Sequence, residues 1–185
     1  LDGSAELVEF PDGTYAPLVD TAFTRYTRVD EGWRVGDRNG VVHDLGLSAA
    51  ARVGDPADGG RVQEYLLERS TDPNGQEIRY RYRHDQGWSY IEQILYASYA
   101  VRFEYEVRPD ARRDGRAGWV RTRALRCRQI GLYLDPGAGD RLVRSWTFTY
   151  EIDPVSGVSL LAAIGMVSHG AASDGSQDVA RAAVR

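Results

Sequence analysis

Apolar and polar residues alternate along much of the chain, and the dominant period is two. Residues 78–83 alternate Ile or Tyr with Arg, and residues 99–107 alternate apolar side chains with Arg and Glu. Residues 146–152 alternate aromatic and aliphatic side chains with Thr and Glu. Strict alternation places apolar side chains on one face of a strand and polar ones on the other, and the aromatic enrichment favours the same structure. The pattern therefore predicts β-strands.

Short turn sequences separate these runs. Residues 37–40 and 72–75 share the pattern Asp-x-Asn-Gly, which is typical of a type I turn closed by a left-handed glycine. Because each turn lies between strand-like runs, we expect hairpins, and successive hairpins predict an all-β, antiparallel meander. We expect about eleven strands, at residues 6–10, 14–18, 23–29, 33–36, 41–45, 62–69, 76–83, 88–95, 100–107, 120–134 and 141–151, and a further one at 158–168.

Some segments interrupt this regular pattern. In the run 120–134, Leu125 and Cys127 keep one parity whereas Ile130 and the leucines after it keep the other, which predicts a bulge or break near Gln129. Residues 62–69 fit a strand or a short helix. Loops rich in Gly, Pro, Asp and Ala are expected at residues 54–61, 109–118 and 135–140, and a linker or disordered tail at 170–185.

Composition narrows the classes of partner. The net charge is −4, which argues against a nucleic-acid or anionic-membrane partner. All 23 basic residues are Arg, so a phosphate-loop lysine and a Schiff-base lysine are excluded. The single Cys excludes a disulfide framework within the chain. No apolar run is long enough to predict a transmembrane helix, and because the chain begins with Leu1 we expect it to be a piece of a longer polypeptide.

Cys127 is the most suggestive candidate for chemistry. Arg126 and Arg128 flank it, and neighbouring arginines lower the pKa of a thiol and favour a nucleophilic thiolate. A nucleophile also needs a positioned base, and no histidine is near in sequence. Because Cys127 shares its parity with Leu125, we expect a buried, inert core thiol instead.

The other candidate groups have structural interpretations. Glu104 and Glu106 share a strand face and could serve as a glycosidase carboxylate pair, but the arginines flanking them on the same strand predict a charge-neutralised sheet face. Asp72 and Asn74 superficially resemble a calcium loop, yet the spacing is that of a turn. His43, His84 and His169 show no metal-ligand spacing, and the first two are expected to be exposed. We therefore expect no catalytic, cofactor-binding or metal-ligating residue, and no cofactor.

The polar strand faces are rich in arginine opposite many glutamates. Arginine on a sheet can pair with carboxylates on neighbouring strands and stack on aromatic rings. Such a face fits a solvated outer surface or the polar inner wall of a hollow structure. Both predict the same alternation, so both stay open.

A family resemblance rests on a series of motifs in order. Residues 32–40, Gly-Trp-Arg-Val-x-Asp-Arg-x-Gly, resemble a stretch of the B component of insecticidal toxin complexes (Tc toxins) and of the related SpvB virulence family. Further similar segments, from residue 7 to residue 168, are Asp55-Pro-Ala, Asp72-Pro-Asn-Gly-x-x-Ile-x-Tyr-x-Tyr, Val101-Arg-Phe-Glu-Tyr-Glu, Leu125-Arg-Cys-Arg-x-Ile, Arg141-Leu-Val-Arg and Ser159-Leu-Leu. The run Tyr82-x-x-Asp85-x-Gly87 resembles a degenerate unit of the Rhs and YD-repeat shells.

The resemblance implies a structural role. It identifies residues 1–169 as a segment like the TcdB middle/N-terminal region, forming part of a large curved or hollow β-shell around a toxic effector. It implies as partners the flanking shell segments and an Rhs-type C component, with no nucleic acid and no membrane insertion. It implies a secreted or extracellular bacterial protein with a cytoplasmic stage before export. The ADP-ribosyltransferase and protease activities of the family belong to other parts, so this segment is expected not to be an enzyme.

Two functions from other classes remain as alternatives. A glycan-binding β-domain would use the 4 Trp and 11 Tyr as a concave platform in a self-contained domain. A hydrolase would use carboxylates on a sheet face, in a deep pocket.

Overall fold

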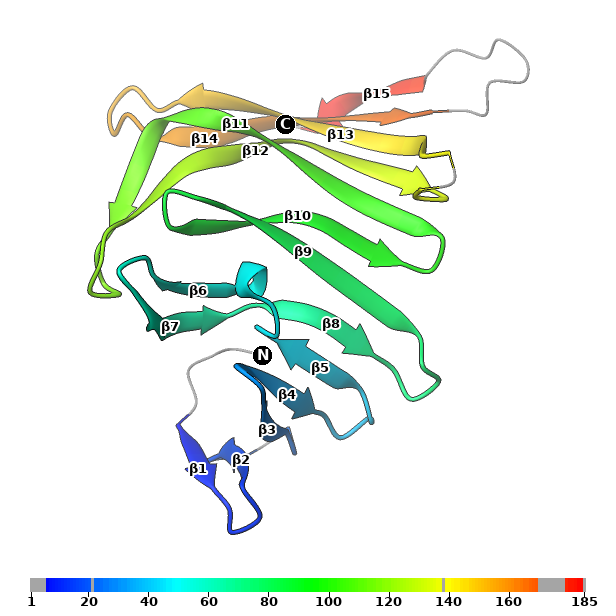
Figure 1. Cartoon of the computed structure of the whole chain (residues 1–185). Coiled ribbons are helices and arrows are strands. Elements are labelled where there is room, and N and C mark those ends of the chain that lie inside the picture. The colour runs from blue at the N-terminus through cyan, green and yellow to red at the C-terminus, as the bar shows by residue number, and fades with distance from the viewer. Residues whose placement is uncertain (1–5, 21, 138, 170–178, 185) are drawn as a thin grey trace. The chain divides into compact units, whose positions relative to one another are not determined.

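The computed structural model describes residues 6–20, 22–137, 139–169 and 179–184 (Figure 1). The chain forms two compact units, Leu1–Arg81 and Tyr82–Arg185. The sequence predicted one segment over residues 1–169, whereas the structure has two units within that range; the assignment of 1–169 to a shell segment stays a prediction. In the part of the chain described, no helix is long or apolar enough for a membrane span.

Unit one is an antiparallel meander of short strands. Its strand order is β1-β2-β3-β4-β5-β8, followed by β9, which crosses into unit two. The strands are β1 (Leu7–Glu9), β2 (Thr14–Pro17), β3 (Arg25–Val29), β4 (Gly32–Gly36), β5 (Val42–Leu45), β8 (Leu67–Thr71) and β9 (Glu77–Asp85). Between β5 and β8 lie a 3-10 turn, η1 (Ala49–Ala51), and a separate hairpin of β6 (Arg52–Asp55) and β7 (Asp58–Tyr65).

The two Asp-x-Asn-Gly sequences form the predicted turns. The side chain of Asp37 accepts hydrogen bonds from the N–H groups of Asn39 and Val41, at 2.8 and 2.9 Å. Asp72 does the same for Asn74 and Gln76, at 2.9 and 2.8 Å. Gly40 and Gly75 then take left-handed φ angles of 78° and 81°, which a side chain would strain. These turns connect β4 to β5 and β8 to β9.

A small apolar core supports unit one. Val35 and Val53 are its largest fully buried side chains. The ring of Trp33 makes edge contacts with Tyr15 and Tyr65, with centroids 5.4 and 6.4 Å apart. At Gly32 a Cβ would lie 2.5 Å from the carbonyl oxygen of Leu45, so the close approach of β4 to β5 requires glycine there.

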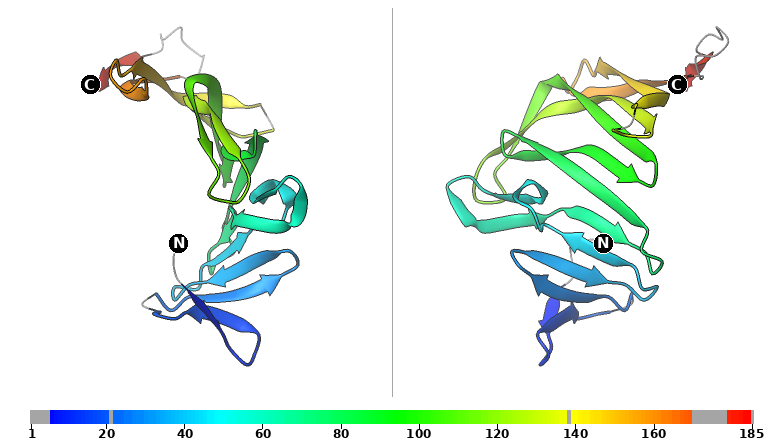
Figure 2. Two further views of the ribbon diagram at one scale, coloured as in Figure 1. Left: turned by 90° about the vertical axis from the view of Figure 1, so that its left-hand side faces the viewer. Right: turned by 45° about the vertical axis from the view of Figure 1, so that its right-hand side comes forward.

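Unit two is one antiparallel sheet of longer strands. Its order runs from the end of β9 through β10-β11-β12-β13-β14-β15. The strands are β10 (Trp88–Tyr96), β11 (Tyr99–Asp114), β12 (Arg121–Leu134), β13 (Arg141–Ile152), β14 (Ser159–Ser168) and β15 (Val179–Val184). Among its described residues there is no helix and no second sheet, and Figure 2 shows these strands from two further sides. Within the described residues of unit two, therefore, no second layer covers either face of this sheet.

Two bulges shape the long hairpin of β11 and β12. Glu104 lies opposite Gln129 but Tyr105 lies opposite Cys127, so Arg128 is an extra residue, which confirms the predicted bulge near Gln129. A larger irregularity occurs between Val107 and Arg112 on β11. The sequence predicted a loop at 109–118, because this segment is rich in Gly, Pro, Asp and Ala; the structure instead continues β11 to Asp114 across this bulge.

The all-β, antiparallel prediction is confirmed, with some corrections. The predicted loop at 54–61 is wrong, because most of it belongs to the β6–β7 hairpin, whose glycines hide the alternation. The predicted strand 62–69 is split at Leu66 into β7 and β8. Of the predicted tail 170–185, residues 170–178 and 185 lie outside the described residues. Residues 179–184 form the strand β15, which pairs with β14, and so they are not a linker.

Candidate functional site

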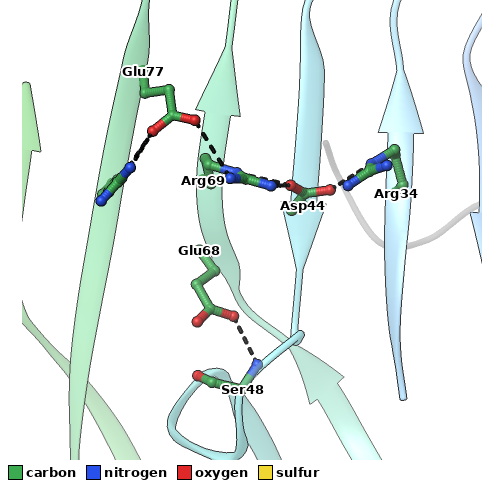
Figure 3. Close-up of polar contacts among 7 residues, drawn as sticks. Arg34, Asp44, Ser48, Glu68, Arg69 and Glu77 are labelled. Atoms are coloured by element: carbon green, nitrogen blue, oxygen red, sulfur yellow. Dashed lines mark hydrogen bonds and ion pairs between the residues drawn. The ribbon is translucent and has the colours of Figure 1, made fainter. Parts of the chain in front are cut away.

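In unit one the arginines of the polar face pair with carboxylates across the strands. Figure 3 shows Asp44 on β5 between Arg34 on β4 and Arg69 on β8. The Nε of Arg34 lies 2.8 Å from one oxygen of Asp44, and the Nη2 of Arg69 lies 2.6 Å from the other. Glu77 on β9 continues the row, 3.4 Å from Arg69 and 2.6 Å from Arg79. The row is a cross-strand ladder of alternating charge.

Asp44 is the buried member of this ladder. Its side chain is 3% exposed, whereas its two arginine partners reach solvent. Burial alone would raise the pKa of Asp44, but the hydrogen bonds from Arg34 and Arg69 outweigh it and hold that pKa below its usual value. A carboxylate held ionised between two guanidinium groups is a structural pair, unsuited to proton transfer.

In unit two the candidate carboxylates are neutralised by arginines of the neighbouring strand. Glu106 on β11 accepts a 2.6 Å hydrogen bond from Arg126 on β12, and Glu104 accepts one of 2.6 Å from Arg128. The sequence had suggested their neighbours on β11 for this role. Those pair elsewhere, Arg102 with Asp140 and Arg108 with Asp110. The sheet face is charge-neutralised as predicted, through different partners.

Cys127 lies beside these pairs but is not activated by them. Both flanking arginines are directed to glutamates, as described above. The thiol is half-buried, and this burial raises its pKa. Its Sγ lies 3.5 Å from the backbone carbonyl of Gln129. These surroundings favour the protonated thiol over a nucleophilic thiolate, and the side chain is less buried than the sequence suggested.

The apolar face of unit two carries an open pocket of about 390 Å³, called here the tyrosine pocket. Tyr90 and Tyr105 meet edge to face, with centroids 5.1 Å apart. Tyrosine hydroxyls tie the strands together: Tyr105 donates to the carbonyl of Ile91 and Tyr150 to that of Cys127, each at 2.6 Å. The lining comes from β10 to β14 and is Trp88, Ser89, Tyr90, Ile91, Phe103, Tyr105, Arg123, Leu125, Arg126, Cys127, Ile130, Phe148, Tyr150 and Leu161.

Guanidinium groups lie over several aromatic rings in this pocket. The Cζ of Arg126 is 4.4 Å from the ring centroid of Tyr150, and that of Arg83 is 5.9 Å from Tyr105. Two further arginines lie over Trp88. A sugar-binding platform needs open ring faces, so this arrangement disfavours the glycan-binding alternative. It suits a face that packs against other protein.

The three histidines lie on different elements, His43 on β5, His84 on β9 and His169 just after β14. His43 is half-buried, contrary to the expected exposure, and its Nδ1 lies 2.9 Å from the hydroxyl of Ser70. His84 is exposed. His169 contacts Ser145 at 2.9 Å through Nε2. Among the described residues, no three His, Cys, Asp or Glu side chains gather as metal ligands would. That the chain has no site residues stays a prediction.

Sequence reasoning missed the residues of the second bulge. Asp110 lies there, paired with Arg108 at 2.7 Å and bound to Ser159 on β14. The predicted loop at 109–118 concealed this contact. The dense run of arginines between residues 108 and 116 was the available signal, because so many like charges require carboxylates or a partner nearby.

Comparison with known proteins adds a family to this geometry. Residues 10–99 match the family model described as SpvB, Salmonella virulence plasmid 65kDa B protein. The curated "Mono(ADP-ribosyl)transferase SpvB" of Salmonella typhimurium (strain 14028s / SGSC 2262) is 33% identical over 90 residues, covering 43% of this chain and 15% of that protein. The same values hold for SpvB of Salmonella choleraesuis (strain SC-B67). The chain thus spans a small part of these relatives.

Solved structures share the fold. The N-terminal domain of effector protein SpvB from Salmonella typhimurium strain LT2 has a TM-score of 0.73 at 21% identity, covering 85% of this chain and 69% of that one. The TcdB2-TccC3-Cdc42 structure has a TM-score of 0.77 at 18% identity, covering 95% and 12%. The Photorhabdus luminescens Tc holotoxin pore has a TM-score of 0.77 at 19% identity, covering 90% and 11%.

Proposed function

We propose that this chain, whose residues 10–99 match the SpvB family model, is a structural segment of a Tc- or SpvB-type toxin protein. It forms part of the wall of a β-shell that encloses a toxic effector and helps to deliver it. In this role its sheets form part of the wall, and none of its side chains takes part in catalysis. The polypeptide to which it belongs is secreted, after a cytoplasmic stage before export.

The uncovered apolar face of unit two carries the proposal. A sheet face lined by Tyr90, Tyr105 and Tyr150 is too apolar to serve as an ordinary solvated surface, yet no second layer among the described residues of unit two covers it. Leu161 on β14, which lines the same pocket, is 51% exposed. Large exposed apolar patches mark surfaces that meet another protein. In a shell, flanking segments or the enclosed effector would cover this face.

The partners follow from the same arrangement. β1 and β15 each have one neighbour in the strand order, so further strands of the same polypeptide can extend the sheets. The similarity to TcdB2-TccC3 structures supports an Rhs-type C component as the second partner. Neither a nucleic acid nor membrane insertion by this segment is part of the proposal.

Enzymatic activity is assigned elsewhere in the full-length protein. The similar part of SpvB in the solved structure is its N-terminal domain, and the chain spans 15% of the SpvB proteins named mono(ADP-ribosyl)transferase. The ion-paired carboxylates and the unactivated thiol of this chain support the same assignment. Any transferase or protease activity therefore belongs to another domain or to the partner.

Protection of the effector from protease tests the proposal. The parent polypeptide is co-expressed with its Rhs-type C component, and cleavage of the effector by added protease is followed on gels. Leu161→Glu places a charge on the uncovered apolar face at an exposed position, so the sheet should still fold. We expect this variant to expose the effector to protease, because the segment covering that face no longer packs.

Val155→Asp is the matched control. Val155 is 93% exposed and lies between β13 and β14, outside the tyrosine pocket. It should leave protection unchanged. If L161E protects the effector as fully as the wild type, and a parent lacking residues 82–169 does too, the wall function is wrong.

A further inference from the structure

A second pocket lies at the end of the β11–β12 hairpin and is lined mainly by arginine. It measures about 480 Å³, and its side chains include Trp88, Arg112, Arg113, Asp114, Arg116 and Arg123. One carboxylate faces four guanidinium groups in this lining. The chain as a whole carries a net charge of −4, whereas the lining of this pocket, called here the arginine pocket, is positively charged.

The register of the hairpin opposes two positive charges here. Elsewhere along these strands the opposed charged residues have opposite signs, as in Glu106 facing Arg126 and Asp114 facing Arg121. Arg112, however, lies directly opposite Arg123. Like charges at directly opposed positions destabilise an antiparallel pair. This unfavourable pair of opposed residues, Arg112 and Arg123, belongs to the pocket lining.

The carboxylate of the pocket is already occupied. Asp114 accepts hydrogen bonds from the Nε and Nη2 of Arg116, at 3.0 and 2.8 Å, and lies 3.6 Å from Arg121. The bonds from Arg116 hold the pKa of Asp114 well below its usual value, so it stays ionised and paired. It has little capacity left to neutralise the remaining arginines.

Three arginines of the pocket therefore have no carboxylate partner among the described residues. Arg112, Arg113 and Arg123 are exposed, and none forms an ion pair there. Elsewhere arginines of this chain take carboxylates as bidentate partners, as Arg108 does with the two oxygens of Asp110. A guanidinium fork matches a carboxylate in shape and charge.

We propose that the arginine pocket binds an acidic segment of another polypeptide, whose carboxylates pair with Arg112, Arg113 and Arg123. Three separate guanidinium groups match several carboxylates along an extended chain better than they match one phosphate group. The ring of Trp88 already carries Arg121 and Arg123, with Cζ atoms 4.9 and 5.7 Å from its centroid. Recognition at this pocket is therefore by charge rather than by stacking on the indole. The pocket would bind such a segment whether or not the chain forms a shell wall.

Binding of fluorescein-labelled octaglutamate to the full chain, followed by fluorescence anisotropy at low salt, tests the proposal. The double variant R112Q/R123Q should weaken binding by about tenfold or more, since two charge-assisted contacts are lost. The variant should still fold, because removing the like-charge rung relieves a repulsion; its thermal midpoint should equal or exceed that of the wild type.

The control is R38Q/R141Q, which removes the same charge from exposed positions outside the pocket. It should change the affinity by less than about twofold, because screening limits the reach of distant exposed charges. Equal weakening in both double variants, or no binding by the wild type, would overturn the proposal. Inorganic phosphate at matched ionic strength should leave octaglutamate bound; displacement by phosphate would assign the pocket to phosphate and overturn it as well.

Discussion

Asp110 on β11 binds Ser159 on β14, although β12 and β13 lie between these strands in the sheet order. Its carboxylate accepts the backbone N–H of Ser159 at 2.9 Å and also the hydroxyl of that serine. The bulge between Val107 and Arg112 makes this reach possible, because it frees Asp110 from the ladder. One irregular segment thus fastens the start of β14 to the far side of the β11–β12 hairpin.

Replacing Asp110 by Ala should strongly destabilise unit two. Arg108 is 8% exposed and pairs with Asp110 at 2.7 Å, so the variant leaves a buried guanidinium without its carboxylate. We expect a loss of about 3 kcal/mol in the free energy of unfolding, measured by urea denaturation. Glu104→Gln, in the more exposed pair with Arg128, is the comparison and should cost less than about 1 kcal/mol. Equal losses in the two variants would show that the bulge contact is unimportant.

The same carboxylate predicts how stability depends on pH. Hydrogen bonds from Arg108 and Ser159 hold the pKa of Asp110 far below the value of about 3.9 for an unfolded aspartate. A depressed folded-state pKa contributes stability above the unfolded pKa, and this contribution is lost as pH falls. The stability difference between the wild type and D110N should therefore be constant near neutral pH and shrink from about pH 5 downward. Urea titrations across this range measure it, and a difference independent of pH would contradict the assignment.

The strands themselves could be predicted because their alternation is local. In the segment from Ile78 to Arg83 and in the run around Phe103, the alternation of apolar and polar residues alone predicts which side chains share a face of the strand. The parity change between Cys127 and Ile130 predicted a bulge near Gln129, and the extra residue in the structure is its neighbour Arg128. The β6–β7 hairpin was missed because Gly54, Gly59 and Gly60 provide no side chains to alternate.

The charge pairs could not be assigned in the same way. The partners of Glu104 and Glu106 depend on the register between β11 and β12, and two bulges shift that register. Sequence spacing suggested neighbours on the same strand, whereas the closest guanidinium groups come from the adjacent strand. The contact of Asp110 with Ser159 joins residues 49 positions apart, and it depends on a bulge in a segment whose sequence predicts a loop. The alternation fixes which face a residue takes, but each bulge shifts the residues that are paired beyond it.

Cys127 should react slowly with a thiol reagent in the folded chain at neutral pH. Burial raises its pKa, so little thiolate is present, and Arg126 and Arg128 are engaged by glutamates. Labelling by an aromatic disulfide, followed by absorbance, should be much faster after unfolding in urea. Cys127→Ala should cost on the order of 1 kcal/mol in the free energy of unfolding through lost packing. Labelling at the same rate in the folded and unfolded chain would contradict this.

The 185-residue chain should self-associate when it is produced alone. Among the described residues β1 pairs only with β2, and such edges expose unpaired backbone groups that pair with other chains. Val8 on β1 is 40% exposed, so this edge is apolar as well. Sedimentation velocity should show larger species growing in at concentrations on the order of micromolar, at which exposed strand edges and apolar surfaces aggregate. Val8→Lys should reduce this growth, because a charge on an edge strand opposes pairing, whereas Val155→Lys in the β13–β14 turn should not.

Co-expression with the flanking segments of the parent polypeptide should also suppress the self-association. A stable monomer, unaffected by those segments, would instead indicate a self-contained binding domain.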